Sequence, residues 1–240
     1  MDLSIVVPIY NEEKLLRNSI EQIYNFLKEA KKIDSYEVIC IDDGSTDTTR
    51  QILETLKIQY PDIIINQKRP NHGKGYSVKE GIQMSTKNYV VFFDADLSTP
   101  LYEINNFIDE MNNTQPDIII GSRNNEKSKT KRSFKRTLIS KTFAILKKLI
   151  CNIYYQDTQC GFKFFKTNTA KDIFEKITIN GFTFDVEMLV IAKNKDYSIK
   201  EKPIEWVEAK TTSLNIFRQV FKMLNDLFYI RKNIKKGLYN

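Results

Sequence analysis

The sequence predicts an α/β protein with a mostly parallel, Rossmann-like β-sheet that is flanked by helices. In the first half of the chain, short apolar runs of strand length alternate with segments whose apolar residues recur at helical spacing. Polar residues follow several of these runs, as they do where strands end at the ligand-binding edge of an open parallel sheet. Such repeated units imply right-handed crossovers between parallel strands. The expected strands cover residues 3–8, 36–41, 63–65, 89–93 and 117–121.

Helices are expected between these strands. The first carries apolar residues at helical spacing between residues 15 and 27, and Asn11 is a suitable N-cap for it. Ser45 or Thr46 is expected to cap the second helix. The third is expected after a glycine-containing loop, and the fourth after Pro100.

The composition is that of a folded protein with one large or two small domains. The chain has 240 residues, of which 41% are hydrophobic and 28% are charged. No apolar run approaches the roughly 20 residues that a membrane-spanning helix needs, and the N-terminal residues lack the pattern of a signal peptide. Cys40, Cys151 and Cys160 have neither metal-ligand nor redox spacing, and their odd number argues against a disulfide framework. We therefore expect reduced, structural cysteines and a cytoplasmic location.

Residues 89–96 form the stretch around which the expected sheet is organised. Five β-favouring residues lead into two carboxylates, Asp94 and Asp96, which are separated by one residue. Two acidic groups at a strand end repel each other unless a cation lies between them. A hard, oxygen-seeking cation, Mg²⁺ or Mn²⁺ shared with a phosphate, suits these ligands. The alternative is a solvated Asp-Ala-Asp turn that binds nothing.

Two other expected strands also end in polar residues. The first is followed by Ile-Tyr-Asn-Glu-Glu and the second by Asp-Asp-Gly-Ser. Because parallel strands end at one edge, we expect the carboxylates there to accept hydrogen bonds from a nucleobase, on which Tyr10 stacks. The alternative is that these acids only favour the positive end of the following helix. The candidate base-binding residues are Pro8, Tyr10, Glu12, Asp42 and Asp43.

Four segments of the first half carry a resemblance to a known family. They read Val-Pro-Ile-Tyr-Asn-Glu-Glu at 7–13, Asp-Asp-Gly-Ser-Thr-Asp at 42–47, Asn-His-Gly-Lys-Gly at 71–75 and Asp-Ala-Asp-Leu at 94–97. Together they resemble the motifs of family-two inverting glycosyltransferases. The resemblance implies the GT-A fold, a nucleoside-diphosphate sugar as donor, and a divalent metal held by the two aspartates of the last segment.

Further motifs follow in the second half. They read Gly-Ser-Arg at 121–123, Asp-Thr-Gln-Cys-Gly-Phe-Lys-Phe-Phe at 157–165, Phe-Asp-Val-Glu at 184–187 and Asp-Leu-Phe-Tyr-Ile-Arg at 226–231. These segments resemble the polyprenyl-phosphate sugar transferases, and most of all the dolichyl-phosphate β-glucosyltransferases. The resemblance extends from residue 3 to about residue 231, with the motifs in the same order.

The resemblance implies transfer of a hexose, expected to be glucose from UDP-glucose, to dolichyl or undecaprenyl phosphate. Arg123 and Lys74 are expected to donate charge-assisted hydrogen bonds to the diphosphate. A phosphate acceptor is ionised at pH 7, whereas a hydroxyl acceptor needs a base, for which Asp185 is the candidate. Gln159 and Lys163 are further candidate substrate-binding residues. A GDP-mannose donor, or a hydroxyl acceptor in polysaccharide synthesis, is the alternative.

Basic residues gather in the second half of the chain. Between residues 127 and 156 there are nine Lys or Arg residues, no Asp or Glu, and interleaved apolar residues. Such a helix suits the interface of an anionic membrane, where Arg132, Lys135 and Arg136 could form a phosphate-binding cluster. The alternative is a core-packed helix with a solvated basic face. Because relatives usually begin with a membrane-spanning helix that this sequence does not show, peripheral attachment to the membrane is expected.

The expected domain organisation follows from these motifs. Residues 1–210 are expected to form the GT-A domain, with a nucleotide-sugar half at 1–123 and an acceptor half at 124–210. Residues 211–240 are expected to form an amphipathic, basic C-terminal helix.

Three other functions fit the sequence less well. Nucleic-acid binding would place a phosphate backbone against an acidic sheet edge, and no recognition module is present. A nucleotidyltransferase would need a glycine-rich basic loop after the first strand, where residues 8–13 are acidic. An inactive nucleotide-sugar-binding subunit would not need the paired carboxylates. His72 is expected to be a loop residue and Trp206 a packing anchor in a strand at 203–207.

Overall fold

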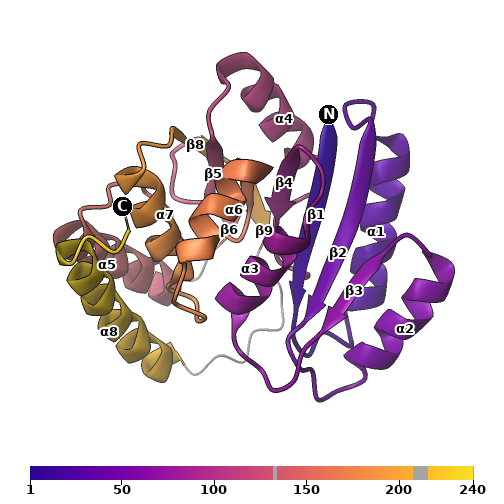
Figure 1. The fold of residues 1–240 in the computed structure, drawn as a ribbon, viewed down its shortest axis with the longest axis horizontal. Helices are drawn as coiled ribbons and strands as arrows, with labels where there is room; N and C mark the ends of the chain where they lie inside the picture. The colour runs from indigo at the N-terminus through magenta and orange to yellow at the C-terminus, as the bar shows by residue number, and fades with distance from the viewer. Residues whose placement is uncertain (132–133, 208–215, 240) are drawn as a thin grey trace.

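The computed structural model describes the backbone of residues 1–131, 134–207 and 216–239, without the side chains of 129–141 and 216–220. It contains a large mixed sheet and a small two-stranded one (Figure 1). The strands are β1 (Asp2–Ile9), β2 (Ser35–Asp42), β3 (Ile64–Gln67), β4 (Tyr89–Phe92), β5 (Ile118–Ser122), β6 (Lys129–Lys131), β7 (Lys163–Lys166), β8 (Ile199–Pro203) and β9 (Glu205–Val207).

The large sheet has seven strands in the order β3-β2-β1-β4-β7-β5-β8. Neighbouring strands are parallel except at β7, which is antiparallel to both β4 and β5. The predicted mostly parallel sheet is therefore confirmed, and all five predicted strands are present. The structure adds β7, which the sequence analysis had treated only as part of a motif, and β8, where no strand was predicted before residue 203.

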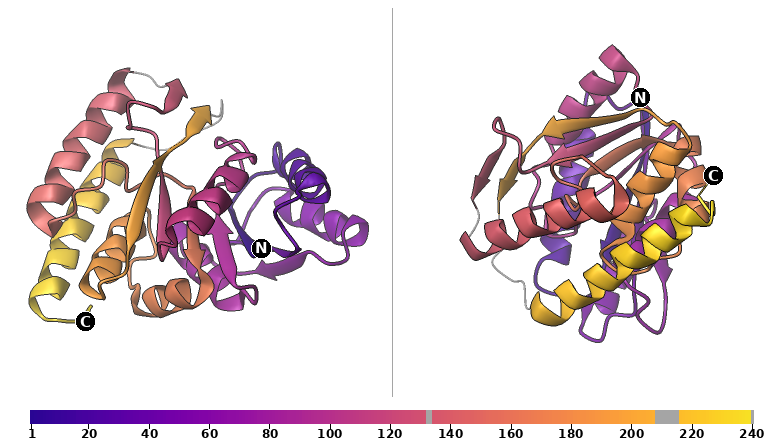
Figure 2. Two further views of the ribbon diagram at one scale, coloured as in Figure 1. Left: turned by 90° about the horizontal axis from the view of Figure 1, so that it is seen from above. Right: turned by 90° about the vertical axis from the view of Figure 1, so that its left-hand side faces the viewer.

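Helices cover both faces of this sheet, which confirms the α/β class (Figures 1 and 2). Strand β1 shows how the sequence specifies the two faces, because side chains alternate along a strand. Leu3, Ile5 and Val7 pack in one buried cluster and Val6 in the other, and all four are fully buried. The helices are α1 (Leu16–Glu29), α2 (Thr49–Gln59), α3 (Lys74–Met84), α4 (Glu103–Thr114), α5 (Phe134–Cys151), α6 (Thr167–Lys176), α7 (Phe184–Asn194) and α8 (Ile216–Lys235).

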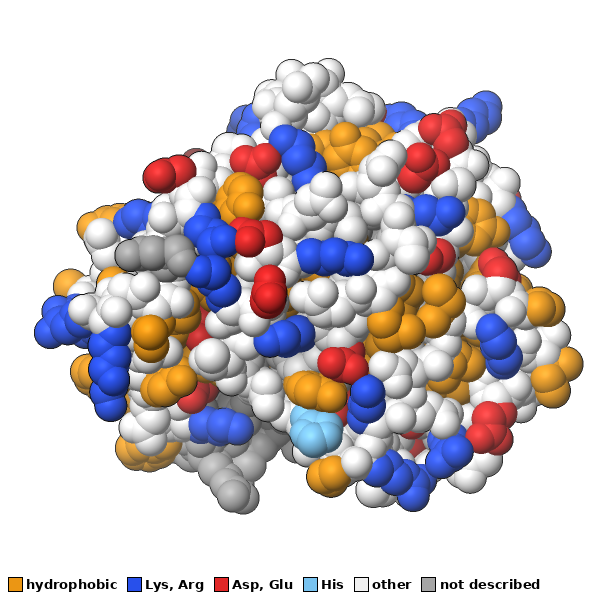
Figure 3. Space-filling view, viewed as in Figure 1, with side chains coloured by type: hydrophobic (Ala, Val, Ile, Leu, Met, Phe, Trp, Pro, Cys, Tyr) orange, Lys and Arg blue, Asp and Glu red, His pale blue; other side chains and the backbone are white. Residues whose placement is uncertain are grey.

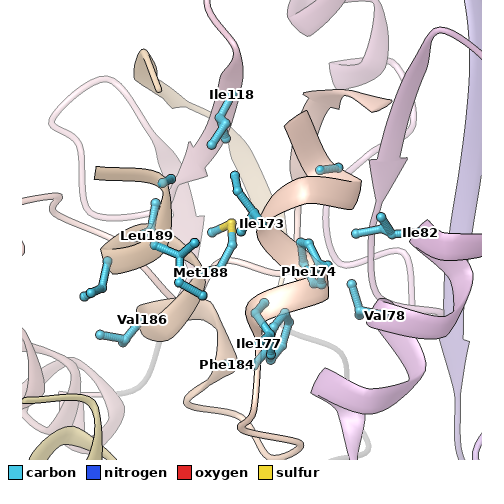
Figure 4. Packing of buried hydrophobic residues seen from close by; sticks show 14 of the residues in the cluster. Val78, Ile82, Ile118, Ile173, Phe174, Ile177, Phe184, Val186, Met188 and Leu189 are labelled. Carbon is cyan, nitrogen blue, oxygen red and sulfur yellow. The ribbon is translucent and has the colours of Figure 1, made fainter. Parts of the chain in front are cut away.

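The two clusters divide the helices between the faces. Helices α1, α2 and α4 contribute to the cluster that contains Leu3, and α3, α6 and α7 to the cluster that contains Val6. Figure 4 shows the second cluster, in which Phe174 of α6 lies between Ile82 of α3 on the right and Met188 of α7 on the left. Helix α7 is buried over nearly its whole length, so it forms an internal layer beneath α5 and α8.

The predicted helix caps were wrong. The first turn of α1 has no side-chain cap. Asn11 instead has a φ of 55°, and its Oδ1 accepts the backbone N–H of Thr46 at 2.8 Å. The first N–H of α2, that of Thr49, is accepted by Asp47 Oδ1 at 3.0 Å. These polar side chains therefore connect the loop after β1 to the loop after β2, instead of capping the helices predicted for them.

The three cysteines are structural, as predicted. Cys40, Cys151 and Cys160 are free and buried. Burial raises the pKa of the Cys40 thiol to about 12 and the pKa of the other two thiols to about 11. They are therefore protonated and unreactive at neutral pH.

Helices α5 and α8 pack side by side and form the outermost layer at one end of the molecule (Figure 2). The inner face of α8 is part of the core, because Leu227 and Ile230 are fully buried. At the end of α5, Arg231 Nη1 donates to the carbonyl oxygens of Leu149 at 3.3 Å and Ile150 at 2.9 Å. Among the described parts of the chain, no helix is both long and apolar enough to span a bilayer.

Candidate active site

The carboxyl ends of β1, β2 and β4 meet at one edge of the sheet. Strands β1 and β2 are in parallel register through Ile9 and Asp42, and β4 pairs with the other side of β1 up to Phe92. The last residues of these strands and the loops that follow them carry the predicted base-binding and metal-binding residues. The sheet therefore brings together segments that lie more than 80 residues apart in the sequence.

The paired carboxylates follow β4 directly. The side chain of Asp94 is 42% exposed, whereas Asp96 is half-buried and its Oδ1 accepts the backbone N–H of Ser98 at 2.9 Å. Burial and the neighbouring Asp94 raise the pKa of Asp96 above its ordinary value. The charge of Asp94 thus disfavours ionisation of Asp96, which is the electrostatic condition that a divalent cation relieves.

Lys74, the first residue of α3, forms an ion pair with Asp94. Although burial disfavours its charged form, Asp94 and Asp185 hold the pKa of Lys74 above its ordinary value. Lys74 is therefore protonated, paired with Asp94 and stabilised in its charged form by Asp185 as well. The prediction that Lys74 binds the diphosphate stays a prediction, and its ammonium lies beside the proposed metal ligand.

Asp43 fixes the loop that leads into Lys74. Its carboxylate accepts the backbone N–H of His72 at 2.9 Å, the backbone N–H of Gly73 at 2.6 Å and the side-chain amide of Asn71 at 3.0 Å. Gly73 has a φ of 111°, and a Cβ there would lie 2.5 Å from the carbonyl oxygen of Asn180. Only glycine fits this turn, so Asp43 and Gly73 together set the start of α3.

The hydrogen bonds of Asp42 and Asp43 bear on the predicted nucleobase contacts. Asp42 Oδ1 accepts the backbone N–H of Ser45 at 3.0 Å and its hydroxyl at 2.5 Å. Both aspartates are only 3% exposed, and both have partners within the protein. Base recognition by these two residues stays a prediction. Tyr10, by contrast, is 47% exposed at the same edge and Pro8 is half-buried.

Glu12 brings a third carboxylate to the paired aspartates. It is half-buried, and burial together with the charges of Asp96 and Asp94 raises the pKa of Glu12 to about 7. Its backbone N–H donates to Thr49 Oγ1 at 2.8 Å, which fixes the loop after β1. The edge therefore concentrates negative charge on the side where a cation is expected.

Arg123 follows β5 and is held by Asp157. Its Nε lies 2.6 Å from Asp157 Oδ2 and its Nη2 lies 2.9 Å from Asp157 Oδ1, and its backbone N–H donates to the same carboxylate at 2.9 Å. The guanidinium carbon lies 5.5 Å from the centre of the Trp206 ring. Against the effect of burial, Asp157 raises the pKa of Arg123. Asp157 therefore orients the residue predicted to bind the diphosphate.

Trp206 is more than the packing anchor that the sequence predicted. Besides its contact with Arg123, it lines a small cavity next to the paired carboxylates. The other residues that line this cavity are Phe93, Asp94, Ser98, Thr99 and Gly161. A Cβ at Gly161 would lie 2.1 Å from Asp94 Oδ2, so the glycine of the Cys-Gly-Phe-Lys motif lets the backbone approach that carboxylate.

Asp185 and Lys163 form an ion pair inside the protein. Their side chains are 5% and 0% exposed, and the Lys163 ammonium also donates to the carbonyl oxygen of Cys160 at 2.5 Å and lies 5.3 Å from the centre of the Phe92 ring. Burial raises the pKa of Asp185 despite this partner. The substrate-binding role predicted for Lys163 stays a prediction, and its fully buried ammonium is already paired with Asp185. Gln159, in the same motif, is half-buried.

Lys147 of α5 is likewise inside the protein, although it had been counted with the basic residues of the surface. It is only 2% exposed, and its ammonium donates to the carbonyl oxygen of Tyr155 at 2.7 Å and to Thr158 Oγ1 at 3.3 Å. Burial lowers the pKa of Lys147 to about 8. Lys147 therefore fixes the segment that carries Asp157, the partner of Arg123.

Replacing Lys147 by Met is expected to lower activity without loss of the fold. The segment that holds Asp157 loses its anchor, so kcat/KM for the sugar donor is expected to fall about ten-fold, which corresponds to about 1.4 kcal/mol. Lys148→Met, a change at the exposed neighbouring lysine, is the matched control. Equal donor kinetics in the two variants would contradict the proposed anchoring.

The pH dependence of stability provides a second measurement on the same variant. The pKa of Lys147 is about 8 in the folded protein, against 10.5 for an ordinary lysine, so the unfolded chain binds more protons between these values. The free energy of unfolding contributed by this group therefore rises as the pH rises from about 8 to about 10.5. This rise should be present in the wild type and missing in Lys147→Met when urea unfolding is measured across that range.

Comparison with known proteins identifies the family. Residues 4–174 match the family Glycosyl transferase family 2. The chain belongs to this family. It is 34% identical over 248 residues to the dolichyl-phosphate beta-glucosyltransferase of Dictyostelium discoideum. This alignment covers 99% of this chain and 76% of the Dictyostelium protein. It is 32% identical over 249 residues to the human protein of the same name, and this alignment covers 99% of this chain and 77% of the human protein. The protein is therefore a glycosyltransferase, as predicted.

Solved structures with the same fold include two synthases. Glucosyl-3-phosphoglycerate synthase from Mycobacterium tuberculosis, in complex with Mn²⁺, UDP and phosphoglyceric acid, has a TM-score of 0.69 at 16% identity and covers 95% of this chain and 78% of its own. Mannosyl-3-phosphoglycerate synthase from Rubrobacter xylanophilus has a TM-score of 0.69 at 14% identity, and the superposition covers 99% of this chain and 76% of the synthase chain. At these identities the likeness concerns the fold, and it confirms the predicted GT-A architecture.

The carboxylates of this family-2 enzyme fit a hard divalent cation. Asp94 and Asp96 supply oxygen ligands, and the raised pKa of Asp96 reflects a charge that a cation would stabilise. Among the side chains that the structure describes, no group of three or more His, Cys, Asp or Glu residues has the arrangement of a metal site. A metal held by the two aspartates would therefore take its other ligands from phosphate oxygens and water, as Mg²⁺ commonly does.

The predicted phosphate-binding cluster lies in a part of the chain whose side chains the structure does not describe. Arg132 belongs to the residues whose backbone is not described, and the side chains of Lys135 and Arg136 are not described either. The phosphate-binding cluster assigned to them therefore stays a prediction. The division into a nucleotide-sugar half and an acceptor half also stays a prediction.

Proposed function

We propose that this glycosyltransferase transfers glucose from UDP-glucose to a polyprenyl phosphate, either dolichyl or undecaprenyl phosphate. The transfer inverts the configuration at the anomeric carbon and uses Mg²⁺ or Mn²⁺ held by Asp94 and Asp96. The relatives that match nearly the whole chain are named for dolichyl phosphate and glucose, which supports this choice of acceptor and sugar. Structural neighbours contain UDP with Mn²⁺ or Mg²⁺, which supports the donor and the metal.

The burial of Asp185 is the observation that favours a phosphate acceptor. Asp185 was the candidate base for a hydroxyl acceptor, yet it is 4% exposed and forms an ion pair with Lys163. A phosphate acceptor is ionised at pH 7, so its oxygen attacks the anomeric carbon without prior proton removal. The bond from that carbon to the UDP oxygen breaks, and the leaving diphosphate keeps the electron pair.

The side chains at the sheet edge have separable roles in this reaction. A divalent metal at the two aspartates would offset the charge that develops on the leaving diphosphate. Lys74 and Arg123 supply positive charge, and the ion pairs with Asp94 and Asp157 fix where that charge lies. Tyr10, which is exposed at the same edge, can stack on the uracil. Trp206 and Gly161 border the cavity beside Asp94 and limit the space there.

A donor and acceptor screen tests the proposal. The purified protein is incubated with UDP-glucose or GDP-mannose, with dolichyl phosphate, undecaprenyl phosphate or a simple alcohol, and with Mg²⁺, Mn²⁺ or EDTA. Mass spectrometry of the lipid product is expected to show a hexosyl phosphate only with UDP-glucose, a polyprenyl phosphate and metal. A product from GDP-mannose alone, transfer to the alcohol alone, or full activity in EDTA would each contradict the corresponding part.

A further inference from the structure

The outer surfaces of α5 and α8 expose apolar side chains that a folded protein usually buries. On α5, Ile145 is 59% exposed and Leu149 is 69% exposed. On α8, Phe221 is 70% exposed and Phe228 is 60% exposed. Residues four or seven apart lie on the same side of a helix, so each pair forms a stripe along its helix. Together these four side chains form an exposed apolar surface at one end of the molecule.

The two stripes belong to one surface. Helices α5 and α8 pack against each other, and Arg231 of α8 donates to two carbonyl oxygens at the end of α5. Both helices lie in front when the molecule is viewed from that end (Figure 2, right). Figure 3 shows apolar and basic side chains alternating along the same edge of the molecule. We name the surface formed by Ile145, Leu149, Phe221 and Phe228 the α5–α8 face.

Positive charge surrounds the α5–α8 face. Lys232, Lys235 and Lys236 continue the α8 stripe beyond Phe228 and are exposed, and with Phe228 and Arg231 they line a groove of about 390 Å³. Lys148 and Lys222 are exposed on the same two helices. Across the sequence of both helices the only acidic residue is Asp226.

This combination selects among possible partners. A nucleic acid would match the lysines but would leave four large apolar side chains in water or against phosphates. A second copy of the same surface would bring like charges together. An anionic membrane matches both properties, since the apolar side chains enter the acyl region while the lysines contact the headgroup phosphates.

We propose that the α5–α8 face docks on the surface of a bilayer that contains anionic phospholipids. The proposal deepens the proposed function, on which it rests, because a polyprenyl phosphate is held in a membrane. Helix α8 lies parallel to the membrane plane, with its apolar stripe inserted and with the groove at Arg231 over the lipid headgroups. The inner face of the helix stays in the protein core, as the burial of Leu227 and Ile230 requires.

Vesicle co-sedimentation tests the proposal without any substrate. The wild type is expected to bind vesicles of phosphatidylcholine with phosphatidylglycerol and to bind phosphatidylcholine vesicles weakly. Replacing Lys232, Lys235 and Lys236 by Gln is expected to weaken binding to the anionic vesicles by about 100-fold at low salt. Binding of the wild type should also fall as salt rises from about 0.1 M to about 1 M, since the screening length shortens from about 10 Å to about 3 Å. Free glycerol phosphate is not expected to compete.

A second variant tests the apolar part, with matched controls at the other end of the molecule. Replacing Ile145, Leu149, Phe221 and Phe228 by Ser is expected to reduce binding to anionic vesicles at every salt concentration. Ile58→Ser is the control for loss of an exposed apolar residue, because Ile58 is 82% exposed on α2. The control for charge is the joint replacement of three exposed cations of α1 and the following turn, namely Arg17, Lys28 and Lys31, by Gln.

The possible outcomes separate this proposal from the proposed function. Wild-type binding by both surface variants, or no wild-type binding to anionic vesicles, would overturn the docking of this face. Docking is also overturned if the wild type is a dimer, the four-Ser variant is a monomer, and that variant still binds vesicles. In that case a second copy of the protein, and not the membrane, covers the α5–α8 face. UDP binding is measured in each variant to show that the sheet edge is intact. Vesicle binding without sugar transfer would reject the proposed function alone.

Discussion

Replacing Asp96 by Asn is expected to abolish sugar transfer while the protein stays folded. The carboxylate follows β4 at the edge where the donor is proposed to bind, and its charge is disfavoured by burial and by Asp94, as expected for one of a pair that shares a cation. A divalent cation at a leaving diphosphate contributes several kcal/mol, so the rate is expected to fall by at least about 10³-fold. Transfer to a polyprenyl phosphate is measured with Mn²⁺, and UDP binding is measured with and without Mn²⁺.

A matched control distinguishes the loss of a metal ligand from the loss of any carboxylate. Asp109→Asn removes an exposed carboxylate of α4 that forms an ion pair with Lys32, far from the β4 edge. This variant should transfer sugar at the wild-type rate. The metal assignment is rejected if Asp96→Asn keeps the Mn²⁺ dependence of UDP binding, or if the wild type transfers sugar at full rate in EDTA.

Asp96→Asn is also expected to change how the stability of the metal-free protein depends on pH. Burial and Asp94 raise the pKa of Asp96, so the folded protein holds this proton to a higher pH than the unfolded chain does. The stability that this group contributes is present at acidic pH and is lost as the pH rises through the raised pKa. Asp96→Asn removes this loss. In EDTA the variant should therefore equal or exceed the wild type in free energy of unfolding at pH 7, whereas at pH 3 the two should converge.

The position of the paired carboxylates could be predicted from the sequence because it depends on short-range order. The apolar run before Asp94 defines a buried strand, and the strand defines where the next residues lie. The parallel pairing of β1, β2 and β4 then follows from the strand–helix pattern. For this reason Tyr10, Glu12 and Asp96 were expected at one edge, and the structure places their segments there.

The burial of lysines could not be predicted in the same way. Lys147 was counted as a surface cation because its neighbours in the sequence are basic and apolar. Its hydrogen-bond acceptors come from the segment at 155–158, which turns back beneath α5. Lys163 is buried because Asp185, 22 residues later, supplies the opposite charge. Whether a long cationic side chain reaches water or a partner depends on tertiary packing, which a helical pattern does not contain.

The partner of Arg123 was missed for a related reason. Asp157 was quoted within a motif, but it lies 34 residues from Arg123 and nothing local connects them. The connection requires β7, whose antiparallel insertion between β4 and β5 brings the residues before it beside the end of β5. An antiparallel strand inside a parallel sheet was not indicated by the strand–helix repeat. The one local signal was that Asp157 is the first acidic residue after the acid-free stretch 127–156.

Removing one partner of the Lys163–Asp185 pair is expected to have the largest effect on stability. Both side chains are at most 5% exposed, so either residue alone would leave an unpaired charge in the core. Breaking a buried pair in this way costs about 3–5 kcal/mol. Lys163→Met and Asp185→Leu, each alone, are therefore expected to lower the free energy of unfolding by this amount in urea titrations. Lys166→Met is the matched control, since that pair with Asp117 is partly exposed.

Replacing both partners together decides whether Asp185 acts as a base or holds the site in place. Apolar residues of similar volume often restore the stability that a single change removes, so the double variant is expected to unfold close to the wild type. If Asp185 only positions Lys74 and the segment of Gly161, the double variant should transfer sugar to a polyprenyl phosphate at a reduced rate with an unchanged pH profile. If Asp185 is instead a base, the refolded double variant should lose transfer completely, and the phosphate-acceptor mechanism proposed for this family-2 enzyme would have to be replaced by one with a proton-accepting carboxylate.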